Sequence, residues 1–325
     1  MITADVIIVG GGPAGSTCAW KLGQNGIKCI ILDRAGFPRD KLCAGWITPQ
    51  VLVDLDIDAG RYPHTLIKFD RFMVHLGTRT LSINVNQYAI RRIQFDHWLL
   101  QRCNAEVHTH PVNAIIKDGK DYVVDDCYRC RYIIGAGGTF CPVYRNIFSS
   151  INPRNKGALI VTLEQELDYD HHDHDCHLWF FQKGLPGYSW YVPKGPGIVN
   201  VGIGGSAGKL KASYDNIRSH WRRFNSELQR SLIKNRQFKG KGYVYYIRDS
   251  VDTVQIDNAF LAGDAAGLAT RDMGEGIGPA VQSGILAAQS IITGSPYSLK
   301  KVKKRSFPRL KTALILSKAR LRSKP

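Results

Sequence analysis

A short apolar run followed at once by three spaced glycines opens the chain and limits its fold most strongly. Val6–Val9 reads VIIV and precedes Gly10-x-Gly12-x-x-Gly15. A continuous apolar run suits a strand that is buried on both faces of a parallel sheet. The first glycine permits a tight turn, the second lets a pyrophosphate approach the backbone, and the third allows close helix packing. We therefore expect a dinucleotide-binding turn.

The residues after this turn complete a βαβ unit. Residues 14–24 have helical character, Gly26 ends that helix, and residues 28–32 form a second apolar strand that closes on Asp33. The phosphates of a dinucleotide would lie at the positive end of the helix. Asp33 has the spacing of an acidic residue that accepts from a ribose hydroxyl. This order favours a dinucleotide site over a simple glycine turn.

The middle of the chain indicates antiparallel sheet. Residues 71–85 alternate around Gly77 as a hairpin does, and residues 157–205 are strand-like, with glycine and proline between the strands. An amphipathic helix spans residues 214–232, and a final helix begins near residue 277. We predict an α/β fold with an α+β insertion: a Rossmann-like nucleotide-binding domain with an interleaved antiparallel-sheet substrate domain.

The expected domains are discontinuous in sequence. The nucleotide-binding domain comprises residues 1–65, 86–150 and 250–296, and the substrate domain comprises residues 66–85 and 151–249. Residues 297–325 form a basic C-terminal tail.

Positive charge is concentrated in this tail. The net charge is +17, no acidic residue follows Glu275, and residues 300–324 contain eleven Lys or Arg. Phe307, Leu310, Leu314 and Leu321 would share one face of a basic amphipathic helix on an anionic membrane. A solvated tail is the alternative interpretation, and no aromatic–basic platform favours nucleic acid.

The lack of a targeting segment and the spacing of the cysteines favour a cytoplasmic protein. Peripheral contact with the inner face of a membrane is an additional expectation. We find no leader-like segment before the first strand and no run of about 18 apolar residues. The eight cysteines are scattered, so reduced thiols are expected. Cys127 and Cys130 have redox or zinc spacing but no second pair, which favours packing thiols.

A second strand end carries a carboxylate among small residues. Residues 262–268 read AGDAAGL and include Asp264, and residues 274–278 read GEGIG. A carboxylate in this setting suits a polyol chain that lies against the backbone. A helix that begins near Gly276 would direct its dipole at an anionic group.

These motifs together resemble a known family. GGGPAG, GDAAG and Arg92-x-x-Phe-Asp96 resemble flavoproteins of the para-hydroxybenzoate hydroxylase fold. Residues 37–45, FPRDKLCAG, are similar to the segment that geranylgeranyl reductases place beside the flavin. Residues 188–193, YSWYVP, resemble the aromatic substrate motif of those reductases, with Val192 in place of phenylalanine. The chain thus resembles a geranylgeranyl-reductase-family FAD-dependent oxidoreductase from residue 5 to about 292.

The resemblance implies FAD and assigns roles by motif. The glycines and Ala14 would take the pyrophosphate, Asp33 the adenosine ribose, and Asp264 the ribityl chain. Arg92 matches the family's arginine, although the adjacent Arg91 could take its place. The implied cofactor-binding residues are Gly10, Gly12, Ala14, Gly15, Asp33, Arg34, Cys43, Ala44, Gly45, Arg92, Val112, Asp264, Gly276 and Ile277.

The resemblance also implies the reaction. Reduced FAD would reduce carbon–carbon double bonds of an apolar isoprenoid, with NADPH or ferredoxin as the electron donor. Cys43 is the candidate catalytic residue, either shaping the site or relaying a proton. The substrate-binding candidates are Trp46, Tyr188, Trp190 and Val192, and the alternative for Trp190 is an ordinary core position. Trp46 replaces a family glycine, and Gly137 replaces a family acidic residue.

Two other functions stay open. Flavin-dependent halogenases carry a related tryptophan-x-tryptophan-x-isoleucine-proline motif, so an oxygen-using monooxygenase or halogenase is the first alternative. The second is a non-catalytic electron-transfer flavoprotein at a membrane surface, or a basic module held on membrane or RNA.

Two further motifs invite binding roles for which structural explanations are preferred. Residues 202–208, GIGGSAG, suggest a second dinucleotide turn, but the alternation of Val199 and Val201 favours a strand. Residues 171–177, HHDHDCH, suggest metal binding, but their position between two strand-like segments favours a solvated hairpin turn. We predict no resident metal.

Overall fold

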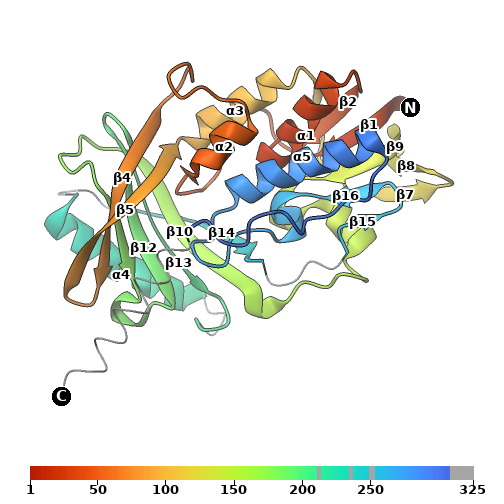
Figure 1. The fold of residues 1–325 in the computed structure, drawn as a ribbon. Helices are drawn as coiled ribbons and strands as arrows, with labels where there is room; N and C mark the ends of the chain where they lie inside the picture. The colour runs from red at the N-terminus through yellow and green to blue at the C-terminus, as the bar shows by residue number, and fades with distance from the viewer. Residues whose placement is uncertain (211–213, 234–235, 237, 249–252, 308–325) are drawn as a thin grey trace.

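The computed structural model describes residues 1–210, 214–233, 236, 238–248 and 253–307. Within this part of the chain two large sheets lie side by side, the first with the N-terminus and the second with helix α4 (Figure 1).

The first sheet is built on parallel strands around β1. Val9 lies opposite Leu32 on one side and Gly135 on the other, so the three strands end together. The strands of this sheet are β15 (Gln255–Ile256), β16 (Ala259–Leu261), β9 (Tyr128–Gly135), β1 (Ile2–Val9), β2 (Cys29–Asp33), β6 (Glu106–Thr109), and the hairpin β7 (Ile115–Asp118) and β8 (Asp121–Val124).

The helices are α1 (Pro13–Gln24), α2 (Pro49–Asp54), α3 (Arg92–Arg102) and α5 (Ile277–Thr293). Helix α1 packs on the buried parts of β1 and β2, α3 and α5 pack on α1, and α2 packs on α5. A Cβ built at Gly284 would lie 2.3 Å from the carbonyl oxygen of Ala14. The backbones of α5 and α1 therefore approach more closely at this point than a side chain would permit.

The second sheet is mainly antiparallel, and the predicted hairpin is confirmed as β4 and β5. Only β11 and β4 pair in parallel. Its strands, in spatial order, are β14 (Lys241–Tyr246), β10 (Leu159–Asp168), β13 (Ile198–Ser206), β12 (Gly187–Gly195), β11 (Cys176–Phe180), β4 (Leu66–Leu76), β5 (Arg79–Ile90) and β3 (Trp46–Ile47).

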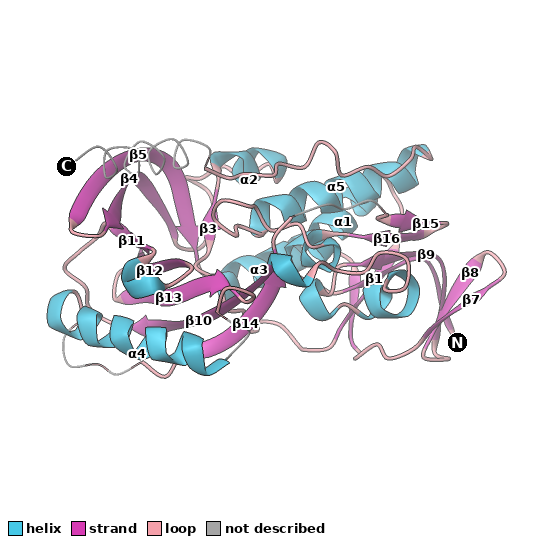
Figure 2. Cartoon of the chain, turned by 90° about the horizontal axis from the view of Figure 1, so that it is seen from below, coloured by secondary structure: helices cyan, strands magenta, loops and turns pink. Residues whose placement is uncertain are grey.

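Helix α4 (Tyr214–Ser231) lies along β10 and β13 and buries the predicted apolar stripe (Figure 2). Ile217, Trp221, Phe224 and Leu228 pack against Val199 and its neighbours. The remaining short helical turns are η1 (Gly138–Phe140), η2 (Tyr144–Phe148), η3 (Lys156–Ala158), η4 (Gln182–Gly184) and η5 (Gly263–Ala266).

The predicted α/β fold with an antiparallel insertion is confirmed. Two segments in the ranges expected for the nucleotide-binding domain pair in the second sheet instead. They are Trp46–Ile47 and residues 86–90, the end of β5. The chain thus crosses between the sheets near Trp46, which carries this residue to the boundary between them.

The start of the basic tail packs on the body. Leu299, Val302 and Phe307 are buried, and the ring of Phe307 lies 6.0 Å from that of Phe72. The expectation that Phe307 faces lipid is therefore wrong, because its ring belongs to the core of the second sheet. Leu310, Leu314 and Leu321 lie outside the described residues. In the part of the chain that the structure describes, no helix combines the length and apolar character needed to cross a membrane.

The histidine-rich segment connects β10 to β11, which do not pair as a hairpin; His172 and His174 are exposed as expected, but the two ends of the segment are buried. His171 is buried and its Nε2 lies 2.9 Å from the carbonyl oxygen of Gly195. His177 lies in β11, where its Nδ1 is 2.9 Å from Nε2 of His75. These pairings anchor the segment to β12 and β4, which explains why polar residues are buried there.

Candidate active site

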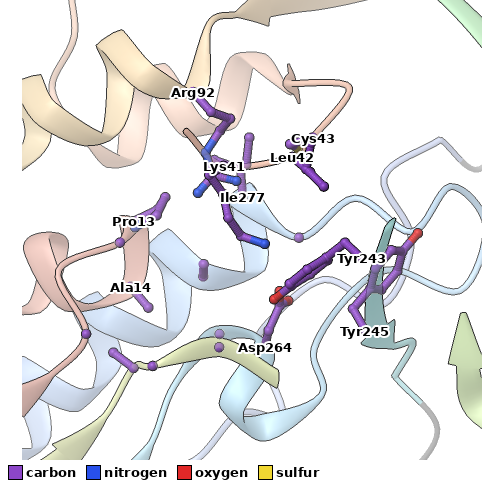
Figure 3. A pocket seen from close by; sticks show the side chains of 18 of the residues that line it. Pro13, Ala14, Lys41, Leu42, Cys43, Arg92, Tyr243, Tyr245, Asp264 and Ile277 are labelled. Atoms are coloured by element: carbon purple, nitrogen blue, oxygen red, sulfur yellow. The ribbon is translucent and has the colours of Figure 1, made fainter. Parts of the chain in front are cut away.

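A cavity of about 610 Å³ opens where the two sheets meet. Its walls come from the β1–α1 turn, the segment 39–46, the start of α5 and strands β10, β12 and β14. Figure 3 shows Lys41, Cys43 and Arg92 on one side and Asp264 with Tyr243 on the other. The cavity brings together most of the predicted site residues: Gly10, Gly12, Ala14, Asp33, Arg34, Cys43, Ala44, Gly45, Trp46, Arg92, Val112, Tyr188, Trp190, Asp264, Gly276 and Ile277.

Two predicted residues do not line this cavity. Gly15 packs inside the turn, where a Cβ would lie 1.9 Å from the carbonyl oxygen of Gly10. Val192 is fully buried in the core of the second sheet. Val192 shares one face of β12 with Tyr188 and Trp190, but it does not line the cavity.

The glycine turn leaves bare backbone facing the cavity. A Cβ built at Gly12 would meet nothing closer than the guanidinium of Arg39, at 3.7 Å. Gly12 is the N-cap residue of α1 and supplies no side-chain cap, so the N-terminal N–H groups of α1 stay available. This arrangement fits a pyrophosphate, which binds such N–H groups at the positive end of a helix.

Asp33 lies beside the turn at the end of β2. Its carboxylate accepts hydrogen bonds from the backbone N–H groups of Gly11, at 2.8 Å, and Ala35, at 3.0 Å. These bonds hold the carboxylate at the cavity wall, next to Arg34 and Val112. This end of the cavity therefore presents the acceptor expected for a ribose.

Asp264 and the start of α5 form the opposite wall. A Cβ at Gly276 would lie 3.2 Å from Oδ1 of Asp264, so these two residues are close neighbours. Glu275 accepts a hydrogen bond of 2.6 Å from the backbone N–H of Gly278. Burial raises the pKa of Glu275 to about 7, although the N–H groups of Gly278 and Ile277 act in the opposite direction.

Arg92, rather than Arg91, reaches the cavity. The guanidinium of Arg92 forms a bidentate ion pair with Asp96, with both distances 2.7 Å. Arg91 instead pairs with Glu166 at 2.7 Å and does not line the cavity. Helix α3 begins at Arg92, whose side chain lines the cavity, whereas Arg91 precedes the helix.

Cys43 lies on a segment that a buried lysine fixes in place. The Sγ atom of Cys43 accepts a hydrogen bond of 3.2 Å from the N–H of Gly45. The ammonium of Lys194 donates to the carbonyl oxygens of Ala44 and Ile90, the latter at 2.8 Å. Burial lowers the pKa of Lys194 to about 8. We had not selected Lys194, although it directly follows the aromatic motif.

Aromatic rings close the other end of the cavity. The ring of Trp46 stacks on that of Tyr188 with 6.2 Å between centroids, and Tyr188 lies 5.6 Å from Trp190. The hydroxyl of Tyr188 donates to the carbonyl oxygen of Met273 at 2.5 Å. These contacts leave a largely apolar wall, in which the Nε1 atom of Trp46 is buried without a hydrogen-bond partner among the described residues.

Trp190 is both a cavity residue and a core residue. Its Nε1–H donates to Oδ1 of Asn200 at 2.7 Å, and the residue is 4% exposed. The ring lies flat over Gly202, where a Cβ would be 2.1 Å from a ring carbon. The glycines of residues 202–205 therefore belong to strand β13, as we preferred, and make room for an indole.

Several lining residues were missed by sequence analysis. Thr162 and Glu164 on β10, and Tyr243 and Tyr245 on β14, face the cavity from the second sheet. The ammonium of Lys41 lies 3.0 Å from the ring centroid of Tyr243. The alternation of polar residues at 162 and 164 was the available signal, because a strand with one buried polar face often lines a site.

Comparison with known proteins agrees with this geometry. A family model described as an FAD binding domain matches residues 3–52. Digeranylgeranylglycerophospholipid reductase 1 of Methanopyrus kandleri is 30% identical over 62% of this chain and 57% of its own length. Geranylgeranyl diphosphate reductase of Rhodobacter capsulatus is 28% identical over 91% of this chain and 78% of its own length.

Solved structures share the whole architecture. A geranylgeranyl bacteriochlorophyll reductase-like protein from Thermoplasma acidophilum matches 98% of this chain and 84% of its own, with a TM-score of 0.77 and 22% identity. The flavin-dependent brominase Bmp2 matches 91% of this chain and 81% of its own, with a TM-score of 0.70 and 19% identity. At these identities the likeness establishes the fold only.

Proposed function

We propose that this chain, which matches an FAD binding domain and is similar to geranylgeranyl reductases, reduces carbon–carbon double bonds in an isoprenoid or prenyl-lipid chain. One observation carries the proposal. A single cavity joins the bare glycine turn, Cys43 and the aromatic wall of Trp46, Tyr188 and Trp190. A cofactor and an apolar chain can therefore meet inside one space.

The cavity-lining residues would each hold a different part of FAD. The turn at Gly12 and Ala14 would bind the pyrophosphate, Asp33 the ribose and Asp264 the ribityl chain. Cys43, Ala44 and Gly45 would flank the ring system, with Arg92 beside Cys43. The backbone at Gly276 and Ile277, at the positive end of α5, would face the ring edge where negative charge develops on reduction.

The protein's own residues would orient the substrate and exclude water. When bound and reduced, FAD would supply the hydride. The rings of Trp46, Tyr188 and Trp190 offer an isoprenoid only apolar surface, worth about 0.8 kcal/mol for each buried CH₂. Because their polar atoms are paired elsewhere or buried, a hydrocarbon loses no hydrogen bond there. Cys43 would lie beside the reacting carbons and either shape the site or relay a proton.

The electron donor and the membrane contact belong to the same proposal. NADPH or ferredoxin would reduce the flavin, and residues 308–325, which carry six basic side chains, would contact an anionic membrane where prenyl lipids reside. Leu299, Val302 and Phe307 pack on the body, whereas the basic side chains between them are exposed and would share this contact.

Anaerobic reoxidation tests the proposal. The flavin-loaded protein is reduced chemically, mixed with geranylgeranyl or menaquinone substrates without oxygen, and followed by flavin absorbance and product mass. We expect reoxidation with formation of a saturated product. A flavin that stays reduced until oxygen enters would contradict the proposal, and a trapped flavin hydroperoxide would favour the monooxygenase or halogenase alternative.

A further inference from the structure

Glu164 is a buried acidic residue whose carboxyl group has no structural role in the fold. It lies in β10, is 3% exposed and lines the cavity beside Thr162. Its Oε2 atom is buried and has no hydrogen-bond partner among the residues that the structure describes. Burial of an unpaired polar atom costs free energy, so native proteins rarely keep such an atom without a function. The partner of this carboxyl group is therefore expected from outside the chain.

The charged groups around Glu164 are engaged with other residues. Lys41 lies over the ring of Tyr243, Lys194 donates to two carbonyl groups, and Arg92 is paired with Asp96. On β10 itself, Glu166 is paired with Arg91. The titratable side chains of β14 on the face of Glu164 are the exposed Lys241, directly opposite Glu164 in register, and the cavity residues Tyr243 and Tyr245.

This environment keeps a proton on Glu164 near neutral pH. Burial raises the pKa of Glu164 to about 7, while the positive charges of Lys41, Lys194 and Arg92 act in the opposite direction. The same cations would stabilise the carboxylate once the proton has left. An acid with a pKa near the working pH is the most effective proton donor.

Building on the proposed reductase function, we propose that Glu164 is the catalytic acid that delivers the proton to the double bond being reduced. FAD, when bound and reduced, would supply a hydride with its two electrons, which would form a C–H bond with one alkene carbon. The O–H bond of Glu164 would break, and its proton would form the second C–H bond on the neighbouring carbon. The π bond would be lost, and Glu164 would become a carboxylate that water reprotonates between turnovers.

The other acids of the cavity are less suited to this step. The hydroxyl of Tyr188 is already bound to the carbonyl oxygen of Met273. Burial raises the pKa of Tyr245, which makes its hydroxyl a weaker acid. Glu275 is engaged by the backbone N–H of Gly278. Cys43 accepts a hydrogen bond from Gly45, which suits a role in shaping the site.

The test compares Glu164→Gln with Glu166→Gln in the flavin-loaded protein. Glu166 lies two residues further along β10 and does not line the cavity. We expect Glu164→Gln to slow anaerobic, substrate-dependent reoxidation by about 100-fold or more. The wild-type rate should fall as pH rises through about 7, because the acid loses its proton. This limb should persist in Glu166→Gln and be absent from Glu164→Gln.

A second readout does not depend on turnover. In the flavin-free protein below pH 7, the infrared band of a protonated carboxyl group should be weaker in Glu164→Gln than in wild type. Equal folding of the two proteins is checked by circular dichroism.

The possible failures are distinguishable. If wild type forms no saturated product, the proposed function fails and the role of Glu164 with it. If wild type forms product and Glu164→Gln matches it in rate and pH profile, only the role of Glu164 is wrong. An unchanged carboxyl band would also overturn this role.

Discussion

Gly202 in β13 lies directly opposite Trp190 in β12, and the missing side chain of the glycine leaves the space that the indole ring occupies. A Cβ at Gly202 would lie 2.1 Å from a ring carbon of Trp190 and 2.8 Å from Cβ of Glu164. Both neighbours are buried, so neither can move away without a cost. Trp190 therefore needs glycine at this position to lie flat on the sheet.

We predict that Gly202→Ala destabilises the protein by about 1–3 kcal/mol, the usual cost of overpacking a core. The free energy of unfolding is measured by urea denaturation. Gly208→Ala is the matched control from the same glycine-rich segment, because a Cβ there meets nothing within 4 Å. Equal stability of the two variants would show that the indole is loosely packed.

Cys43 is the residue that our sequence analysis placed beside the reacting carbons. We predict that Cys43→Ser lowers the rate of anaerobic reoxidation or changes which double bond is reduced, because the thiol lies on the cavity wall beside Arg92. Stopped-flow absorbance and product mass spectrometry measure both. A variant with unchanged rate and regiochemistry would remove Cys43 from the mechanism.

At the scale of an element, the start of α5 depends on Glu275. The first N–H groups of a helix have no partner within it, and Oε1 of Glu275 accepts that of Gly278 at 2.6 Å. We predict that Glu275→Ala costs about 0.5–2 kcal/mol in unfolding free energy, as loss of a helix cap does. Glu275→Gln retains a side-chain acceptor, so at acidic pH it should lose less unfolding free energy than Glu275→Ala does.

The pH dependence of these variants follows from the buried carboxyl group. The pKa of Glu275 is raised from 4.5 to about 7 on folding, so the folded state binds the proton more tightly. This contribution to stability is complete below pH 4.5 and is lost as pH rises through about 7. Glu275→Gln lacks this titration, so its free energy of unfolding should rise relative to that of wild type as pH increases from 4.5 to about 7. A constant difference between the two proteins would contradict the assignment.

At the scale of the whole molecule, residues 299–307 connect the core of the first sheet to the core of the second sheet. The buried Arg248 donates to the carbonyl oxygens of Val302, at 2.7 Å, and Leu299, at 2.6 Å. Asp272 accepts from the N–H of Phe307 at 2.7 Å, next to the cavity residue Met273. A deletion that begins at residue 298 would therefore damage the core as well as remove the tail.

Truncation after Phe307 is the cleaner test of membrane contact. It removes six of the eleven basic residues of the tail and keeps every contact just described. We predict an unchanged flavin spectrum and unfolding transition, with weaker binding to vesicles of anionic lipid in a flotation assay. The full-length chain on neutral vesicles is the control. Equal binding of both proteins to anionic vesicles would assign the contact to another surface.

The sequence alone determined the βαβ unit, the antiparallel insertion and many of the residues that line the cavity. These features depend on local patterns, because a glycine turn, an apolar strand and a following acid are neighbours in the chain. Arg92 was harder to choose over Arg91, since the decision depends on where α3 begins.

Only the tertiary structure decided which side chains of the second sheet reach the cavity. Glu164 and Tyr245 come from different strands, and their meeting at the cavity depends on strand register, which pairs residues far apart in the chain. The same register leaves Val192 in the core and Trp190 at the cavity. Burial of Phe307 likewise depends on a remote partner, Phe72, because no local pattern separates an apolar residue that packs on the body from one that faces lipid.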